Sequence, residues 1–435
     1  MASKPLERLE EFAIDVILER RYGKRAAILR LFLWLLSGLY RRIMEWRVWL
    51  YEERYYPVHA LGCMVISVGN LTVGGTGKTP VVEKFARELT RNGRKVAILS
   101  RGYKSYKPPL LKRLWHRFLR GGDPTPPRVV CDGRSLLLDS AMAGDEPFML
   151  AQNLHDVIVL VGKDRVKSGL YAIQKFGCDT LLLDDGYQYL PLKERFDVLL
   201  VDIEAPYGNN YMLPRGMLRE PPEHLKRADI IFLTKCNGSD MSALKKDLRQ
   251  YNKHARFIEC THTPLYLEDL VTGQRVELDI LKGMRVGAVS GIARPESFED
   301  GLRRLGVDLL YSKRFADHHR FNAQEIEQVI QRTKARGGRA VITTEKDAVR
   351  FPRREKCLLP IYFLRVEIKI LQGEEIFHEC VRDLCERYSC AAIPDPSLLP
   401  GGAPGNDFAT PVLQPLPPRD LAPHGLPVPV ISHAT

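Results

Sequence analysis

The sequence predicts an α/β fold built on a doubly wound, mainly parallel β-sheet, with a second and smaller α/β domain. Short runs of aliphatic and β-branched residues alternate with longer amphipathic segments along most of the 435 residues. This is the pattern of parallel strands joined by helical crossovers. The alternation is interrupted between residues 257 and 284, where short segments around Thr272 and Gly273 indicate a hairpin. We therefore expect a β hinge between two α/β domains.

The first 57 residues predict amphipathic helices. Apolar residues recur at near-helical spacing from Leu6 to Leu18, and a more apolar run extends from Ala26 to Tyr40. That run has about fifteen residues, whereas about 20 are needed to span a bilayer. Tryptophans and arginines are interleaved from Trp34 to Trp49, which favours a helix that lies in the lipid headgroup plane. The alternative is a helix that packs internally against the next domain.

Residues 65–80 predict a buried strand, a glycine-rich turn and the start of a helix, which is the setting of a phosphate-binding P-loop. Glycines let backbone N–H groups point at a phosphate, and the helix N-terminus adds a partial positive charge. Lys78 would supply a cation for the β- and γ-phosphates, and the Thr79 hydroxyl would be a hard oxygen ligand for Mg²⁺. The expected ATP-binding residues are Thr72, Val73, Gly74, Gly75, Thr76, Gly77, Lys78 and Thr79.

The loop departs from the usual pattern G-x-x-x-x-G-K-[ST] at one position. Thr72 stands where that pattern has its first glycine, although Gly74, Gly75 and Gly77 follow closely. The alternative is an ordinary glycine-rich turn between a strand and a helix. The correct order of strand, loop, Gly-Lys-Thr and helix favours nucleoside triphosphate binding.

Further strands are expected at residues 95–100, 157–161, 180–185, 198–202 and 230–234. The third of these ends in Asp184 and Asp185, which is the form of a Walker B element that holds Mg²⁺. We expect Asp184 to bind the metal directly or through water, together with Thr79, and Asp185 to lie in the same turn. The alternative for the two acids is a capping turn before Gly186.

Composition limits the class of protein and its partners. The net charge of +12 suits an anionic partner such as a nucleotide, a nucleic acid or an acidic membrane surface. Nine cysteines are scattered without a C-x-x-C pair, so neither zinc nor a disulfide framework is indicated, and a reducing cytosol fits best. A basic amphipathic insert lies within residues 104–122 and could contact lipid or form a solvated lid. The proline-rich end of the chain is expected to be disordered.

These elements divide the chain into five parts. They are membrane-associating helices (1–57), a P-loop core domain (58–256, with the insert at about 104–122), a hinge hairpin (257–284), a smaller α/β domain with a return strand (285–389) and a disordered tail (390–435).

The chain resembles the tetraacyldisaccharide 4′-kinase family from about Arg8 to Arg387. The resemblance rests on seven motifs in the expected order, which are far more specific together than the P-loop alone. They are Val68 to Pro80, Ser100 to Tyr103, Gly144 to Pro147, Leu183 to Gln188, Leu218 to Pro221, Phe315 to His319 and Thr343 to Asp347. The insert and the tail are atypical of the family.

This resemblance implies a P-loop core, a smaller second domain and a two-stranded hinge. It also implies an ATP-dependent lipid kinase with Mg²⁺ that transfers the γ-phosphate to the 4′-hydroxyl of a tetraacylated glucosamine disaccharide 1-phosphate. The product would be lipid IVA, in the lipid A branch of lipopolysaccharide biosynthesis. Such an enzyme would be peripheral or monotopic on the cytoplasmic face of the bacterial inner membrane.

The family resemblance also implies roles for single residues. Asp145 would be the general base for the attacking hydroxyl, and His318, from the second domain, would orient that carboxylate and share its proton. From the sequence alone, Asp145 could equally be a helix N-cap, and His318 could be a structural or solvated loop residue. If the two residues act together, they would meet when the hinge closes.

Other residues are expected to bind phosphate or lipid. Arg165 would reach the γ-phosphate as a fixed positive charge, unless it is a surface arginine between Lys163 and Lys167. The remaining residues match or adjoin family positions that handle the lipid headgroup. They are Tyr103, Lys104, Arg219 and Glu220.

Two other function classes compete with this interpretation. A P-loop GTPase or metallochaperone-type switch would read guanine with an [NT]-K-x-D element, but Thr234-Lys235-Cys236 is followed by Asn237, which lacks the carboxylate. A nucleic-acid-binding protein would suit the basic charge. Because the basic residues lie among tryptophans and leucines, an anionic lipid surface fits better than nucleic acid.

Overall fold

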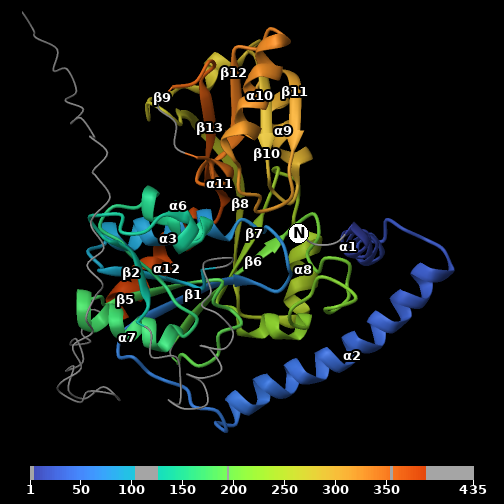
Figure 1. Cartoon of the computed structure of the whole chain (residues 1–435). Coiled ribbons are helices and arrows are strands. Elements are labelled where there is room, and N and C mark those ends of the chain that lie inside the picture. Colours follow the sequence, from blue (N-terminus) through green and yellow to red (C-terminus); the bar gives the residue numbers. More distant parts are fainter. Residues whose placement is uncertain (1–3, 103–125, 194, 353–355, 388–435) are drawn as a thin grey trace, which may run out of the picture.

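The computed structural model describes residues 4–102, 126–193, 195–352 and 356–387 (Figure 1). The expectations for the basic insert and for the proline-rich tail lie outside these ranges. So do the expectations for Tyr103 and Lys104.

One sheet of 13 strands runs through the described residues. Its order is β11-β10-β12-β13-β8-β7-β6-β1-β5-β2-β4-β3, with β9 paired to β8. The strands are β1 (Met64–Asn70), β2 (Val96–Ser100), β3 (Arg128–Asp132), β4 (Ile158–Val161), β5 (Thr180–Asp184), β6 (Arg195–Asp202), β7 (Ile230–Thr234), β8 (Arg256–Asp269), β9 (Arg275–Val276), β10 (Arg285–Ser290), β11 (Asp308–Arg314), β12 (Ala340–Thr344) and β13 (Ile361–Gln372).

Helices separate most of these strands along the chain. They are α1 (Lys4–Ile17), α2 (Lys24–Glu52), α3 (Lys78–Arg91), α5 (Ser140–Ala143), α6 (Asp145–Asn153), α7 (Arg165–Phe176), α8 (Ser242–Tyr251), α9 (Pro295–Arg304), α10 (Ala323–Ala335), α11 (Glu345–Ala348) and α12 (Glu374–Arg387). Two 3₁₀ helices, η1 (Pro222–Arg227) and η2 (Leu278–Leu281), complete the set.

The central strand β1 is buried along its whole length, and its alternate residues face two separate cores. Ile66 packs in one cluster with Phe85 of α3. Val65 packs in another cluster with Ala172 of α7. Helices therefore cover both faces of the sheet, which explains why its strands read as nearly continuous apolar runs in the sequence.

Most neighbouring strands are parallel, but the long strands β8 and β13 pair antiparallel to each other. They join the half of the sheet that contains β1 to the half that contains β10, β11 and β12, and Figure 1 shows two lobes connected there. The predicted α/β class, with a mainly parallel P-loop-type sheet, is confirmed.

The C-terminal helix α12 follows β13 back to the first lobe. There the ring of Phe377 lies 5.0 Å from the ring of Phe85 on α3. Packing therefore groups α12 with the P-loop lobe, and the exact domain boundaries remain a prediction.

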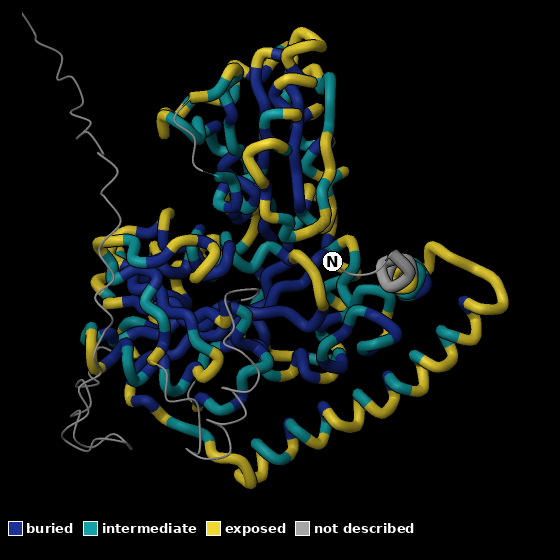
Figure 2. The backbone as a smooth tube through the Cα atoms, in the orientation of Figure 1, coloured by how far each residue is buried: buried dark blue, intermediate teal, exposed yellow. Residues whose placement is uncertain are grey.

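The long helix α2 runs along the outside of the P-loop lobe (Figure 1). Exposed residues recur along it in Figure 2, and only Ala26, Ser37, Met44 and Val48 are buried. Ser37 Oγ donates to the carbonyl oxygen of Met212 at 2.8 Å, which ties the inner side of the helix to the lobe. Among the described helices, none combines the length and the hydropathy required to cross a bilayer.

Candidate active site

The glycine-rich loop connects β1 to α3, and its last glycine cannot be replaced without strain. Gly77 is the N-cap of α3 and has a left-handed φ of 79°. A Cβ atom there would lie 2.3 Å from Nε2 of His262, which belongs to β8. Just before it, the buried Oγ1 of Thr76 has no hydrogen-bond partner among the described residues. An unsatisfied buried hydroxyl in such a loop suits a polar ligand.

Lys78 is held by two side chains at the edge of the sheet. Its Nζ donates to Asn70 Oδ1 at 3.1 Å and lies 3.4 Å from Asp185 Oδ1. The Asn70 amide also donates to the carbonyl oxygen of Thr72 at 2.8 Å. Thr72 itself is buried and forms an isolated bridge with Leu218, so the loop accommodates threonine where the usual pattern has glycine.

Asp184 ends β5, the parallel neighbour of β1, where it pairs in register with Val68. Its carboxylate is buried and accepts from Ser100 Oγ at 3.1 Å. Burial, followed by the charges of Glu146 and Asp185, raises the pKa of Asp184 to about 7. A buried carboxyl group crowded by other acids is an environment that a divalent cation would stabilise.

Asp185 follows directly, with a left-handed φ of 53° that is unusual for a residue with a side chain. It accepts two hydrogen bonds from Arg219 Nη1, at 2.9 and 2.8 Å. Burial alone would raise the pKa of Asp185, but the charges of Lys78 and Arg219 outweigh it and lower the pKa. Asp185 therefore connects the P-loop lysine to the expected lipid-binding arginine.

Arg165 begins α7 and is buried, whereas Lys163 beside it is exposed. The alternative of a surface arginine is therefore wrong. Its Nη2 lies 3.5 Å from the carbonyl oxygen of Asp184, and its Nε has no hydrogen-bond partner among the described residues. Burial lowers the pKa of this guanidinium. An incompletely paired buried arginine beside the end of β5 has donors left for an anion.

Asp145 and His318 meet across the two lobes. Asp145 Oδ2 lies 2.9 Å from His318 Nδ1, and both side chains are largely buried. The N-cap of α6 is Gly144, so Asp145 is the first helical residue and the capping alternative is wrong. His318 has a left-handed φ of 62°, a strained conformation of the kind that concentrates at functional sites.

Two arginines surround the Asp145 carboxylate. Arg350 Nε lies 3.4 Å from Oδ2, and Arg320 Nη2 lies 3.6 Å from Oδ1. Burial alone would raise the pKa of Asp145, but the hydrogen bond from His318 and the charges of Arg350, His318 and Arg320 together lower it. The carboxyl group is therefore ionised at neutral pH and able to accept a proton.

Arg219 and Glu220 point in different directions. Arg219 contacts Asp185, whereas Glu220 is completely buried. Glu220 Oε2 lies 2.5 Å from Arg227 Nη2 and 2.8 Å from His224 Nδ1. This arrangement corrects the expectation that Glu220 handles the lipid headgroup, because a carboxylate without exposed surface and with two internal partners supports the loop beside Arg219 instead.

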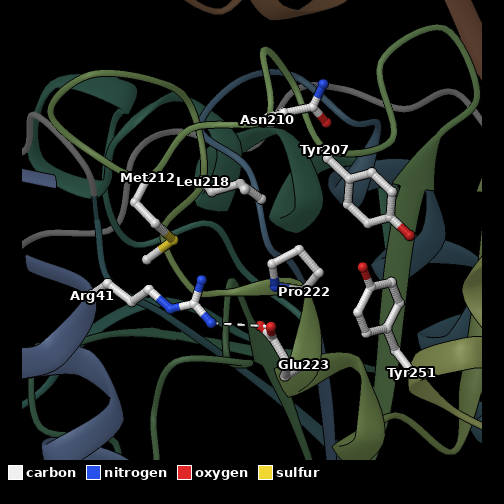
Figure 3. Close-up of a pocket in the computed structure, with 8 residues that line it drawn as sticks. All are labelled: Arg41, Tyr207, Asn210, Met212, Leu218, Pro222, Glu223 and Tyr251. Atoms are coloured by element: carbon white, nitrogen blue, oxygen red, sulfur yellow. Dashed lines mark hydrogen bonds and ion pairs between the residues drawn. The ribbon is translucent and has the colours of Figure 1, made fainter. Parts of the chain in front are cut away.

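A cavity of about 280 Å³ lies between α2 and the P-loop lobe (Figure 3). One of its lining residues, Leu218, directly precedes Arg219, and none belongs to the P-loop. Polar and apolar groups both line its walls, and Arg41 Nη2 pairs with Glu223 Oε1 at 3.0 Å there. It is lined by Arg41, Tyr207, Asn210, Met212, Leu218, Pro222, Glu223 and Tyr251.

Sequence reasoning missed four residues that hold the proposed site together. They are Asn70, Ser100, Lys346 and Arg350. Asn70, Ser100 and Lys346 lie within the sequence motifs given above, and their membership in these motifs could have indicated a role in the site. Arg350 lies just after the last motif and is fixed by Asp347 at 2.8 Å, a contact that only the folded chain reveals.

Comparison with known proteins identifies close relatives. A family described as tetraacyldisaccharide-1-P 4′-kinase matches residues 29–386. A tetraacyldisaccharide 4′-kinase of Anaeromyxobacter dehalogenans is 38% identical over 332 residues, covering 75% of this chain and 83% of the relative. That of Geobacter sulfurreducens is 37% identical over 351 residues, covering 80% and 92%. The crystal structure of Aquifex aeolicus LpxK in complex with ATP aligns with a TM-score of 0.63 at 28% identity, covering 83% of this chain and 99% of that one.

Proposed function

The chain belongs to the tetraacyldisaccharide 4′-kinase family, and we propose that its P-loop and its Asp145–His318 pair together phosphorylate an acylated disaccharide 1-phosphate at the 4′-hydroxyl. The observation that carries the proposal is the proximity of the two groups. Asp145 is the first residue of α6 and Lys78 is the first residue of α3, and these two helices pack against each other. The base expected to take the hydroxyl proton thus begins a helix that contacts the helix of the P-loop.

In this reaction the 4′-oxygen forms a bond to the γ-phosphorus, and the bond from the γ-phosphorus to the β,γ-bridging oxygen breaks to release ADP. The hydroxyl proton passes to Asp145, which His318 holds in orientation. Phosphoryl transfer demands little covalent chemistry from the protein, so a carboxylate of low pKa is an adequate base. Lys78 and Arg165 would stabilise the charge on the phosphate oxygens.

The residues present fit Mg²⁺. Thr79 in the first turn of α3 and Asp184 at the end of β5 offer hard oxygen ligands, and Asp185 follows Asp184 directly. No group of three or more acidic, histidine or cysteine side chains within the described ranges is arranged to bind a metal alone. This is normal for Mg²⁺, which keeps water and substrate phosphate among its ligands. When bound, the ion would neutralise charge on the β- and γ-phosphates.

Purified full-length protein is expected to transfer ³²P from γ-labelled ATP to a tetraacyl-disaccharide 1-phosphate. Free glucosamine should not be labelled, and GTP should not replace ATP, since Asn237 follows the Thr-Lys-Cys sequence after β7. Chromatography of the labelled lipid is the measurement. Label on free sugar, or transfer that prefers GTP, would contradict the proposal.

We further propose that α2 rests on the anionic cytoplasmic face of the bacterial inner membrane. Its exposed apolar residues include Leu31, Trp34, Leu35 and Trp46, each more than half exposed. A helix with exposed apolar residues and interleaved arginines suits the headgroup plane. The Tyr40 hydroxyl donates to the carbonyl oxygen of Arg219 at 3.0 Å, so the helix that meets the lipid also holds the expected headgroup arginine.

Replacing Leu31 and Leu35 by glutamate is expected to weaken binding to phosphatidylglycerol vesicles by about tenfold or more, because apolar area and positive charge on α2 are both reduced. Added salt should weaken the wild-type contact. Flotation with vesicles is the measurement. Leu358→Glu, which changes an exposed leucine of the second lobe, is the control and should bind normally. Equal flotation of the α2 variant and wild type would place the membrane contact elsewhere.

The rival interpretation as a GTPase or metallochaperone-type switch is not favoured, because the family match extends across both lobes. Lys235 and Asn237, which follow β7, were the sequence basis of that rival. Lys235 Nζ lies 2.5 Å from Asp202 Oδ2 and 3.1 Å from Glu204 Oε2. These ion pairs connect the lysine to the end of β6, so it has a structural role.

A further inference from the structure

We propose that Lys346 is a positioning residue for phosphoryl transfer, which orients the His318 ring so that its Nδ1 proton is donated to Asp145. The proposal rests on the function proposed above, and it adds a third residue to the Asp145–His318 pair. Lys346 Nζ lies 3.4 Å from His318 Nε2, the ring nitrogen opposite the one that faces Asp145.

The chemistry of the lysine sets the tautomer. A charged ammonium group has three donors and no acceptor. The His318 nitrogen that faces it must therefore present its lone pair, which leaves the single ring proton on Nδ1. That proton points at Asp145 Oδ2, 2.9 Å away, so the carboxylate is held as the acceptor of a hydrogen bond.

Other charged groups also lie near the ring. Asp317 Oδ2 lies 3.9 Å from His318 Nε2, and the guanidinium groups of Arg320 and Arg350 face Asp145. On this account the role of His318 is to orient Asp145.

Lys346 is held in place by contacts on both sides. Its Nζ also pairs with Glu146 Oε1 at 3.3 Å, so it links the second lobe to the residue after Asp145. It lies in α11, whose N-cap Thr344 accepts at Oγ1 from the backbone N–H of Asp347 at 3.1 Å. The lysine is therefore unable to move away from the ring without breaking the Glu146 pair.

The neighbouring Glu345 anchors the same helix to the P-loop lobe. Its Oε1 accepts from Asn153 Nδ2 at 2.6 Å and from Arg365 Nη1 at 2.5 Å. Arg365 also pairs with Glu83 of α3, the helix that begins with Lys78. The position of Lys346 is thus tied to the helix of the P-loop, which makes the tautomer of His318 dependent on the assembled site.

The first test reads the tautomer directly. In full-length protein labelled with ¹⁵N-histidine, the neutral form of His318 is expected to show a protonated Nδ1 and an unprotonated Nε2. Loss of the signal in His318→Asn assigns it. A neutral ring that carries its proton on Nε2 would overturn the proposal. This reading needs no lipid substrate, so it stands even if the proposed kinase activity fails.

The second test uses turnover. Lys346→Met is expected to lower kcat about tenfold at neutral pH, a smaller loss than removal of the base itself, and to change the KM for ATP less than about twofold. Lys346→Arg, which keeps a cation, should retain most of the activity.

Lys334→Met, an exposed lysine on α10 in the same lobe, is the matched control and should behave as wild type. An unchanged kcat in Lys346→Met would overturn the proposal. A KM for ATP that rises in parallel with the fall in kcat would also overturn it, because Lys346 would then be a nucleotide-binding residue. If Lys346→Met does not fold, the tautomer measured in the wild-type protein decides the question.

Discussion

Replacement of Lys78 by alanine is expected to lower kcat for phosphoryl transfer by about 10²–10³-fold, the loss typical of removing one group that stabilises transition-state charge. The ammonium is positioned in advance by Asn70 Oδ1 at 3.1 Å and Asp185 Oδ1 at 3.4 Å, so it meets the phosphates at little entropic cost. Initial rates with γ-labelled ATP and the acylated disaccharide measure the effect.

Companion substitutions separate the charge from the helix that carries it. Thr79→Ala should show a loss of similar size, whereas Thr79→Ser keeps a hydroxyl for the metal and should retain most activity. Lys84 lies on the same helix, with its Nζ 5.5 Å from the Phe377 ring. Lys84→Ala is therefore the control and should leave kcat nearly unchanged. Near-wild-type turnover in both Lys78→Ala and Thr79→Ala would remove the P-loop from the mechanism.

The fold class was predictable because parallel strands covered by helices on both faces produce a simple local signal. The runs that begin at Val65, Val96 and Thr180 are apolar throughout, and each becomes a buried strand. Strand order was not predictable, because β1 lies between β5 and β6, which come more than a hundred residues later. Local patterns contain no information about such pairings.

For the N-terminal helix α2, hydrophobic periodicity could predict a helix but not the face that contacts the protein. The residues after Ala26 are apolar on most sides of a helix, so the sequence could not identify the face that meets the protein. In the fold, the inner face is marked by Ser37 and Tyr40, which bond to backbone oxygens of Met212 and Arg219. Those partners lie 175 and 179 residues away along the chain.

In the candidate site, too, features set by a short stretch of chain could be predicted, and contacts between distant segments could not. The P-loop could be read from the sequence because one turn and one helix end determine its geometry. The burial of Glu220 could not be read from the sequence, because it depends on contacts of its Oε2 with Arg227 and His224 in the folded chain. Lys346 lies within a sequence motif, but its contact with His318, 28 residues earlier in the chain, exists only in the folded lobe.

Asp145→Asn is expected to lower kcat by about 10²–10⁴-fold, the range for general-base assistance, while ATP affinity changes little. The amide oxygen can still accept from His318 Nδ1, so the arrangement of the two side chains is preserved. The amide lacks a basic oxygen and cannot take the hydroxyl proton. Single-turnover rates at saturating ATP isolate this step from binding.

The melting temperature of Asp145→Asn should fall by no more than about 2 °C, which corresponds to roughly 2 kcal/mol in a chain of this size. Arg350 loses the charge 3.4 Å from its Nε, but it keeps Asp347 Oδ1 at 2.8 Å from its Nη2. No buried guanidinium is therefore left without a carboxylate partner. A large loss of activity with a small loss of stability would separate a chemical role from a structural one.

Asp139 provides the matched control, because it is a true helix cap six residues upstream. Its Oδ1 accepts from the backbone N–H of Met142 at 2.8 Å at the start of α5. Asparagine caps a helix about as well as aspartate, so Asp139→Asn should keep both its melting temperature and its kcat. Asp145 has no such local role, since Gly144 is the cap of α6.

His318→Gln should lose less activity than Asp145→Asn, because the histidine orients the base and does not take the proton. Two residues that act as one unit are not additive, so the double variant should be little worse than Asp145→Asn alone. Independent roles would instead multiply the two losses. A stable Asp145→Asn enzyme with wild-type kcat would exclude the carboxylate as the base, and the contact between the lobes would then serve only to hold them together.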